Sequence, residues 1–128
     1  LSRSLIASRL REAMPQGTIS CARAHRLAAA LERSPAAVGT AIDLLEGRIV
    51  RCQLGLFGYS PAKKLARAAA AVAPELEADI RQSLEEGRLS CAAAWRIADA
   101  RGLPRLALAE ACERLGLRIA RCQLGAFG

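Results

Sequence analysis

The sequence predicts a mainly helical fold built from two copies of one unit, each with three helices and short strands. Shifting the 128-residue chain by 70 positions aligns residues 1–58 with residues 71–128 without a gap, and 21 of the 58 pairs are identical. Apolar residues make up 52% of the chain and aromatic residues only 3%, which suits closely packed helices better than a β-sandwich. We therefore expect a first repeat at 1–58, a basic linker at 59–70 and a second repeat at 71–128. Units of this size are near the lower limit for a self-sufficient core, so the two should pack against each other.

The first element of each repeat is predicted to be a helix, because one apolar residue recurs in every turn. Gly17 and Gly87 are expected to cap the ends of these two helices. The chain starts at Leu1 without an initiator Met, so we expect it to be a piece of a longer product. Its Arg- and Ser-rich opening has a counterpart in the second repeat and is therefore interpreted as structure and not as a transit peptide. The apolar residues that define the two helices are Ile6, Leu10, Met14, Leu76, Ile80 and Leu84.

A second and a third helix follow in each repeat. Ser20 and Ser90 are the expected N-caps of the second helices. Short turns at 32–34 and 102–103 should separate them from the third helices, which open at Ser34-Pro35 and at Pro104. Each repeat then ends in an alternating apolar and polar stretch followed by glycines, which predicts a strand and a tight loop. These stretches are Arg48–Gln53 and Arg118–Gln123, and both run into Gln-Leu-Gly-x-Phe-Gly.

The spacing within residues 20–46 and 90–116 resembles the helix-turn-helix and winged-helix superfamily of DNA-binding domains. A small residue stands where the two helices cross, a turn follows four residues later, and an apolar residue comes six residues after that. In the second repeat these are Ala98, Gly102 and Leu108, whereas the first repeat has Glu32 in place of the turn glycine. The resemblance implies a DNA-binding transcriptional regulator or regulatory domain whose third helix faces the major groove.

The candidate nucleic-acid contacts lie mainly in the first repeat and the linker. The net charge of +7 divides into +4 for residues 1–58, +3 for residues 59–70 and zero for residues 71–128. The third helices offer few base-reading side chains, of which Thr40 and Arg105 are the candidates, so phosphate contacts should dominate. The alternative is a solvated basic face without a partner. The candidate phosphate contacts are Arg23, Arg26, Arg48, Arg51, Lys63, Lys64 and Arg67.

Four of the five cysteines form two equivalent pairs, Cys21 with Cys52 and Cys91 with Cys122. Cys21 and Cys91 each follow an N-cap serine, where a helix dipole lowers the pKa of a thiol, so a thiol–disulfide switch within each repeat is one hypothesis. An iron–sulfur cluster shared by both repeats is another, and it requires the two repeats to face each other. The simpler alternative is that all the cysteines are buried apolar residues and that the protein takes no cofactor.

The sequence does not predict an enzyme. It has one histidine, and no Ser/His/Asp set, paired carboxylates or cofactor fingerprint is recognisable. A protein-interaction or accessory module with the same fold, but without base readout, is the alternative to DNA binding. We expect a cytoplasmic protein without a membrane span, and the sequence leaves its oligomeric state open.

Overall fold

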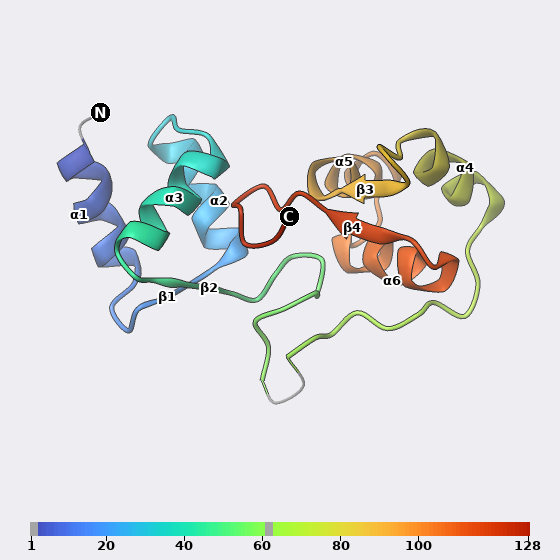
Figure 1. Cartoon of the computed structure of the whole chain (residues 1–128), viewed down its shortest axis with the longest axis horizontal. Helices are drawn as coiled ribbons and strands as arrows, with labels where there is room; N and C mark the ends of the chain where they lie inside the picture. The colour runs from blue at the N-terminus through green and yellow to red at the C-terminus, as the bar shows by residue number, and fades with distance from the viewer. Residues whose placement is uncertain (1–2, 61–62) are drawn as a thin grey trace.

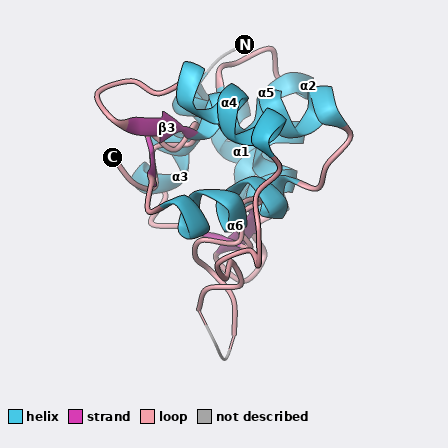
Figure 2. Cartoon of the chain, turned by 90° about the vertical axis from the view of Figure 1, so that its right-hand side faces the viewer, coloured by secondary structure: helices cyan, strands magenta, loops and turns pink. Residues whose placement is uncertain are grey.

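The computed structural model describes residues 3–60 and 63–128, and it confirms a mainly helical fold with short strands (Figure 2). The first repeat contains α1 (Arg3–Ala13), β1 (Thr18–Ser20), α2 (Cys21–Ala30), α3 (Pro35–Leu44) and β2 (Arg48–Val50). The second contains α4 (Pro74–Gln82), β3 (Arg88–Ser90), α5 (Cys91–Arg101), α6 (Arg105–Leu115) and β4 (Arg118–Ala120). None of the helices in these two ranges has the length and apolar character needed to cross a membrane.

Serine side chains fix where the second helices begin, as predicted. The hydroxyl oxygen of Ser20 accepts a hydrogen bond from the main-chain N–H of Arg23, and Ser90 accepts one from Ala93. Each serine thereby satisfies one of the N–H groups that a helix start leaves without a partner. As a consequence, the residue after each serine is held in the first turn of its helix.

The first helices end earlier than predicted. α1 stops at Ala13 and α4 stops at Gln82, so Gly17 and Gly87 are not their caps. Both glycines have φ +78° and lie in the turns that lead into β1 and β3. In the first repeat Pro15 explains the early end, because proline has no N–H to continue a helix.

Each repeat holds one two-stranded parallel sheet, a pairing that the sequence did not predict. Ser20 pairs with Val50, and Ser90 pairs with Ala120. Two parallel strands need a long crossover, which is supplied here by the pair of helices between them. The strands end sooner than the predicted stretches because the next residues, Arg51 and Arg121, adopt the left-handed region at φ +52° and +53°.

Beyond the bridge between Tyr59 and Lys63, the linker is an extended segment that packs on the second repeat. The main-chain N–H groups of Leu65 and Ala66 donate to the oxygen of Gly55, and that of Ala69 donates to the oxygen of Glu110 in α6. Ala66 is buried in the core of the second repeat. The linker therefore positions α4 and α6 as well as joining the two repeats.

The two hydrophobic cores exchange their terminal loops. Leu54 follows β2 of the first repeat but is buried in the core formed by α4, α5 and α6. Leu124 follows β4 of the second repeat but is buried in the core formed by α1, α2 and α3. Figure 1 shows the red C-terminal loop reaching from β4 toward α2 and α3, while the green segment after β2 runs toward α6.

Candidate functional site

The junction between the repeats brings equivalent residues into contact with each other. The rings of Phe57 and Phe127, which occupy the same position in the two repeats, meet edge to face with their centroids 6.2 Å apart. The rings of His25 and Trp95, another equivalent pair, lie 4.2 Å apart. Contacts between equivalent residues are what a two-fold interface produces. The repeats are therefore packed like the two halves of a symmetric dimer.

Trp95 is sandwiched between two side chains at this junction. His25 covers one part of the indole, and the guanidinium of Arg105 lies 3.7 Å from the ring centroid. Burial, followed by the charge of Arg105, lowers the pKa of His25 below its usual value. The indole N–H of Trp95 is buried and has no hydrogen-bond partner among the described residues. Arg105 is thus a structural residue of the junction, where it also forms an ion pair with Asp99 at 2.9 Å.

The paired cysteines lie around the same junction, and all of them are free thiols. The main-chain N–H of Gln53 donates to the sulfur of Cys21. In the second repeat the side-chain amide of Gln123 donates to the sulfur of Cys91 at 3.5 Å. The strand register thereby places the start of α2 beside the loop after β2, and the start of α5 beside the loop after β4.

The expectation of activated thiols at the helix starts is wrong. The pKa of Cys21 is raised to about 12, chiefly by burial and to a smaller extent by the thiols of Cys52, Cys91 and Cys122, although the N–H of Gln53 lowers it. Burial also raises the pKa of Cys91. Removal of these sulfurs from water outweighs the helix dipole. Cys112, which has no equivalent cysteine in the first repeat, lies in the second core, where burial raises its pKa to about 11.

The described residues contain no ready-made site for a single metal ion. No three His, Cys, Asp or Glu side chains within residues 3–60 and 63–128 are grouped closely enough to hold a metal ion. Cys52, Cys91 and Cys122 all contribute to raising the pKa of Cys21, so thiols of both repeats lie in the neighbourhood of this sulfur. The condition for a shared four-cysteine site, two repeats that face each other, is met by the fold.

Four predicted phosphate contacts of the first repeat form an exposed set that we call the basic face. None of these arginines forms an ion pair within the described part of the chain. The set consists of Arg23 and Arg26 on α2, Arg48 on β2 and Arg51 directly after it.

Two of the equivalent arginines in the second repeat, Arg96 and Arg121, bond to side chains of their own repeat. Arg121 forms an ion pair with Glu85 at 3.1 Å, and the position equivalent to Glu85 in the first repeat is Pro15. Arg96 donates to the hydroxyl of Ser83 at 3.4 Å, and the equivalent of Ser83 is Ala13. Six ion pairs in the described residues use a carboxylate of the second repeat, the last of them with the linker. They are Arg81–Glu77, Arg88–Glu86, Arg101–Asp79, Arg105–Asp99, Arg121–Glu85 and Lys64–Glu113.

Some of the other predicted nucleic-acid contacts bond to groups of the protein itself, and others are exposed to solvent. Thr40 donates its hydroxyl to the oxygen of Ala36 within α3, at 3.1 Å. Lys64 is paired with Glu113. Lys63 and Arg67 are exposed, and neither side chain forms an ion pair in the described ranges.

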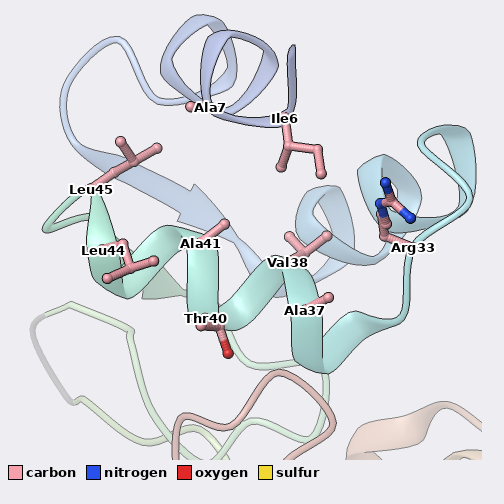
Figure 3. Close-up of a pocket in the computed structure, with 9 residues that line it drawn as sticks. All are labelled: Ile6, Ala7, Arg33, Ala37, Val38, Thr40, Ala41, Leu44 and Leu45. Carbon is pink, nitrogen blue, oxygen red and sulfur yellow. The ribbon is translucent and has the colours of Figure 1, made fainter. Parts of the chain in front are cut away.

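One side of the third helix of the first repeat is covered by the C-terminal loop of the second repeat. Leu124 of the second repeat packs on it at Gly39, where a Cβ would stand 1.8 Å from the Leu124 oxygen. The face between α1 and α3 is instead an apolar groove of about 600 Å³, at whose rim Leu44 is 79% exposed (Figure 3). The groove is lined by Ile6, Ala7, Arg33, Ala37, Val38, Thr40, Ala41, Leu44 and Leu45.

Sequence reasoning missed the loop exchange and the sandwich around Trp95. One signal was present, because Trp95 and His25 are large side chains at equivalent positions of a chain with few aromatic residues. No protein-family model matches this chain, and no match was found among curated proteins or among solved structures. Its function must therefore be argued from its own geometry.

Proposed function

We propose that the chain is a non-enzymatic regulatory module that binds duplex DNA through phosphate contacts made by the basic face, Lys63 and Arg67. One observation carries the proposal: the arginines of the basic face are exposed without ion-pair partners, whereas acids neutralise many cations of the second repeat. An exposed arginine without an internal partner can release the counterions of a phosphate. The anion-binding surface is thus confined to one repeat and the linker.

In this proposal each repeat is a winged-helix-like unit. The order helix, strand, helix, helix, strand and the short turn between the second and third helices support this interpretation. The parallel pairing of the strands is a departure from the antiparallel hairpin that gives the winged helix its name. Since Thr40 is engaged within α3 and Gly39 is covered by Leu124, the DNA contact is expected to be independent of sequence.

The test is the salt dependence of binding to a fluorescent duplex of about 20 base pairs, followed by anisotropy. Four to six phosphate contacts give a slope of log K against log salt of about −4 to −5. Affinity should then fall by at least a hundredfold, roughly, between 50 and 200 mM salt. An unlabelled duplex of unrelated sequence should compete equally well.

The matched variants use the internal repeat. Arg26→Gln with Arg51→Gln should reduce the slope by about 2, because two phosphate contacts are lost. The control is Arg96→Gln with Arg121→Gln, which changes the equivalent residues of the second repeat and should leave the slope unchanged. Binding that does not depend on salt, or an equal loss in both double variants, would contradict the proposal.

The second candidate is a protein-interaction module without base readout. It is favoured by the apolar groove between α1 and α3, where the first repeat has Leu44 and the second repeat has Arg114 at the equivalent position. If the chain fails to bind duplex DNA even at low salt, this candidate takes the place of DNA binding.

A further inference from the structure

The four equivalent cysteines take no part in the proposed DNA contact, and they surround the junction between the repeats. We propose that Cys21, Cys52, Cys91 and Cys122 form one four-thiolate site that takes a [4Fe–4S] cluster between the two repeats. Four cysteine thiolates are the usual ligand set of such a cluster. The inference is independent of DNA binding, since it concerns a different set of residues.

The strand register brings the cysteines together in pairs. Cys21 directly follows Ser20, which pairs with Val50, and Cys52 lies two residues beyond that partner. The second sheet repeats this arrangement through Ser90 and Ala120, which places Cys91 near Cys122 in the same way. Each parallel sheet therefore places two cysteines just beyond the ends of its paired strands.

The exchange of loops then brings the two pairs to one place. Cys52 is 4% exposed and is buried in the core of the second repeat, together with Cys91. Cys122 packs against the core of the first repeat, which contains Cys21. Each core thus holds one helix-start cysteine of its own repeat and one loop cysteine of the other. The four cysteines are thereby shared between the two cores.

Hydrogen-bond donors point at the sulfurs. The main-chain N–H of Gln53 donates to Cys21, and both the main-chain N–H and the side-chain amide of Gln123 donate to Cys91. Donors of this kind stabilise thiolate ligands and tune the potential of a cluster.

A cluster needs its thiolates less close together than a single ion does. Tetrahedral zinc holds its sulfurs about 3.8 Å apart, given a Zn–S distance of about 2.3 Å. No three candidate ligands within residues 3–60 and 63–128 are grouped tightly enough for one ion. The iron atoms of a cubane cluster lie at separate corners, so its thiolate ligands are spread more widely than those of one ion.

Loading by ligand exchange needs no oxidant or reductant. A synthetic [4Fe–4S]²⁺ cluster with four 2-mercaptoethanol thiolates exchanges these ligands for the protein thiols. Four Fe–S bonds to cysteine form and four Fe–S bonds to mercaptoethanol break. The four cysteine protons pass to the departing thiolates, which leave as four neutral thiols, and the charge of the cluster core is unchanged.

The test is an anaerobic titration of the full chain with this synthetic cluster, followed by gel filtration. The expected result is a protein fraction with absorbance near roughly 400 nm and about four iron atoms per chain. Cys21→Ala, Cys52→Ala, Cys91→Ala and Cys122→Ala should each lose this absorbance. Cys112→Val is the control, because the equivalent position holds Ile42, and it should keep the absorbance.

A second measurement avoids variants that lose a buried residue. Gln123→Leu removes the side-chain donor to Cys91 and should shift the reduction potential of the loaded cluster to more negative values. An unchanged potential would show that Cys91 is not a ligand in the proposed site. The proposal would also fail if the wild-type chain took up no cluster, if Cys112→Val lost it, or if one zinc ion per chain displaced it.

Discussion

The main-chain oxygen of Leu124 lies where a side chain on Gly39 would have to be, because a Cβ at Gly39 would stand only 1.8 Å from it. Gly39 is inside α3, where alanine would normally be favoured by about 1 kcal/mol. The equivalent residue of α6 is Ala109. Glycine at position 39 is thus explained by the close approach of the C-terminal loop and not by helix formation.

Gly39→Ala should therefore destabilise the protein, by about 1–3 kcal/mol, since backbone must move to make room for the methyl group. Urea denaturation followed by circular dichroism measures the change. Thr40→Ala, at the exposed neighbouring position, is the control and should change stability by less than about 0.5 kcal/mol. A gain in stability for Gly39→Ala would show that the loop does not lie on α3 in solution.

Leu54→Ala should weaken the repeat that does not contain it. Leu54 is fully buried in the second core, so its truncation should cost about 2–5 kcal/mol. Hydrogen exchange should show the greater loss of protection in α5 and α6. Leu124→Ala is the mirror control and should act mainly on α2 and α3. If each variant loosened its own repeat instead, the exchange of loops would be refuted.

Glu32→Gly should stabilise the first repeat. Glu32 has φ +55° in the turn between α2 and α3, where the second repeat has Gly102 at φ +65°. The left-handed conformation costs a residue with a side chain about 1 kcal/mol relative to glycine. The melting temperature should rise for Glu32→Gly and fall for Gly102→Ala. An unchanged or lower melting temperature for Glu32→Gly would contradict this account of the turn.

The junction should be sensitive to acid through His25. Burial, followed by the charge of Arg105, lowers its pKa in the folded protein, so the unfolded chain binds the proton more readily. The stability is therefore greatest above the unfolded pKa of about 6.5 and is lost as the pH falls below it. Urea midpoints between pH 7.5 and 5 should decrease in the wild type. His25 is the only histidine, so in His25→Gln they should stay nearly level.

Cys21 should react slowly with iodoacetamide. With a pKa of about 12, its thiolate fraction at pH 8 is on the order of a thousandfold below that of an ordinary cysteine. Mass spectrometry after timed alkylation should show little modification at Cys21 in the folded protein and rapid modification in urea. Cys122, which is only partly buried, provides the comparison within the same sample and should be alkylated earlier. Modification of Cys21 at the rate of an exposed thiol would exclude this burial.

The parts that the sequence predicted are those governed by local chemistry. The hydroxyls of Ser20 and Ser90 cap their helices because an N-cap needs only the three residues that follow. The turn at Gly102 is of the same kind. The repeat itself was visible as identity in the sequence, and the described helices and strands follow the same order in both halves.

The features that the sequence did not predict depend on tertiary packing, that is, on which distant residues a side chain contacts in the folded protein. Leu54 and Leu124 would be apolar in either case, whether their loops pack on their own repeat or on the other one. The sequence therefore does not distinguish the two arrangements. The pKa of Cys21 depends on the competition between burial and a helix dipole, and only the packed structure decides it. The early end of α4 at Gln82 has no local explanation in the residues that follow.

The linker allows the two repeats to carry different residues at equivalent positions. In a homodimer every substitution appears in both subunits. Two different residues at equivalent positions, such as Trp95 and His25 or Gly39 and Ala109, would therefore be impossible. Because residues 59–70 hold both halves in one chain, their association occurs at a high effective concentration. Each half can therefore change alone, and here the first repeat has an excess of cations whereas the second has as many acidic as basic residues.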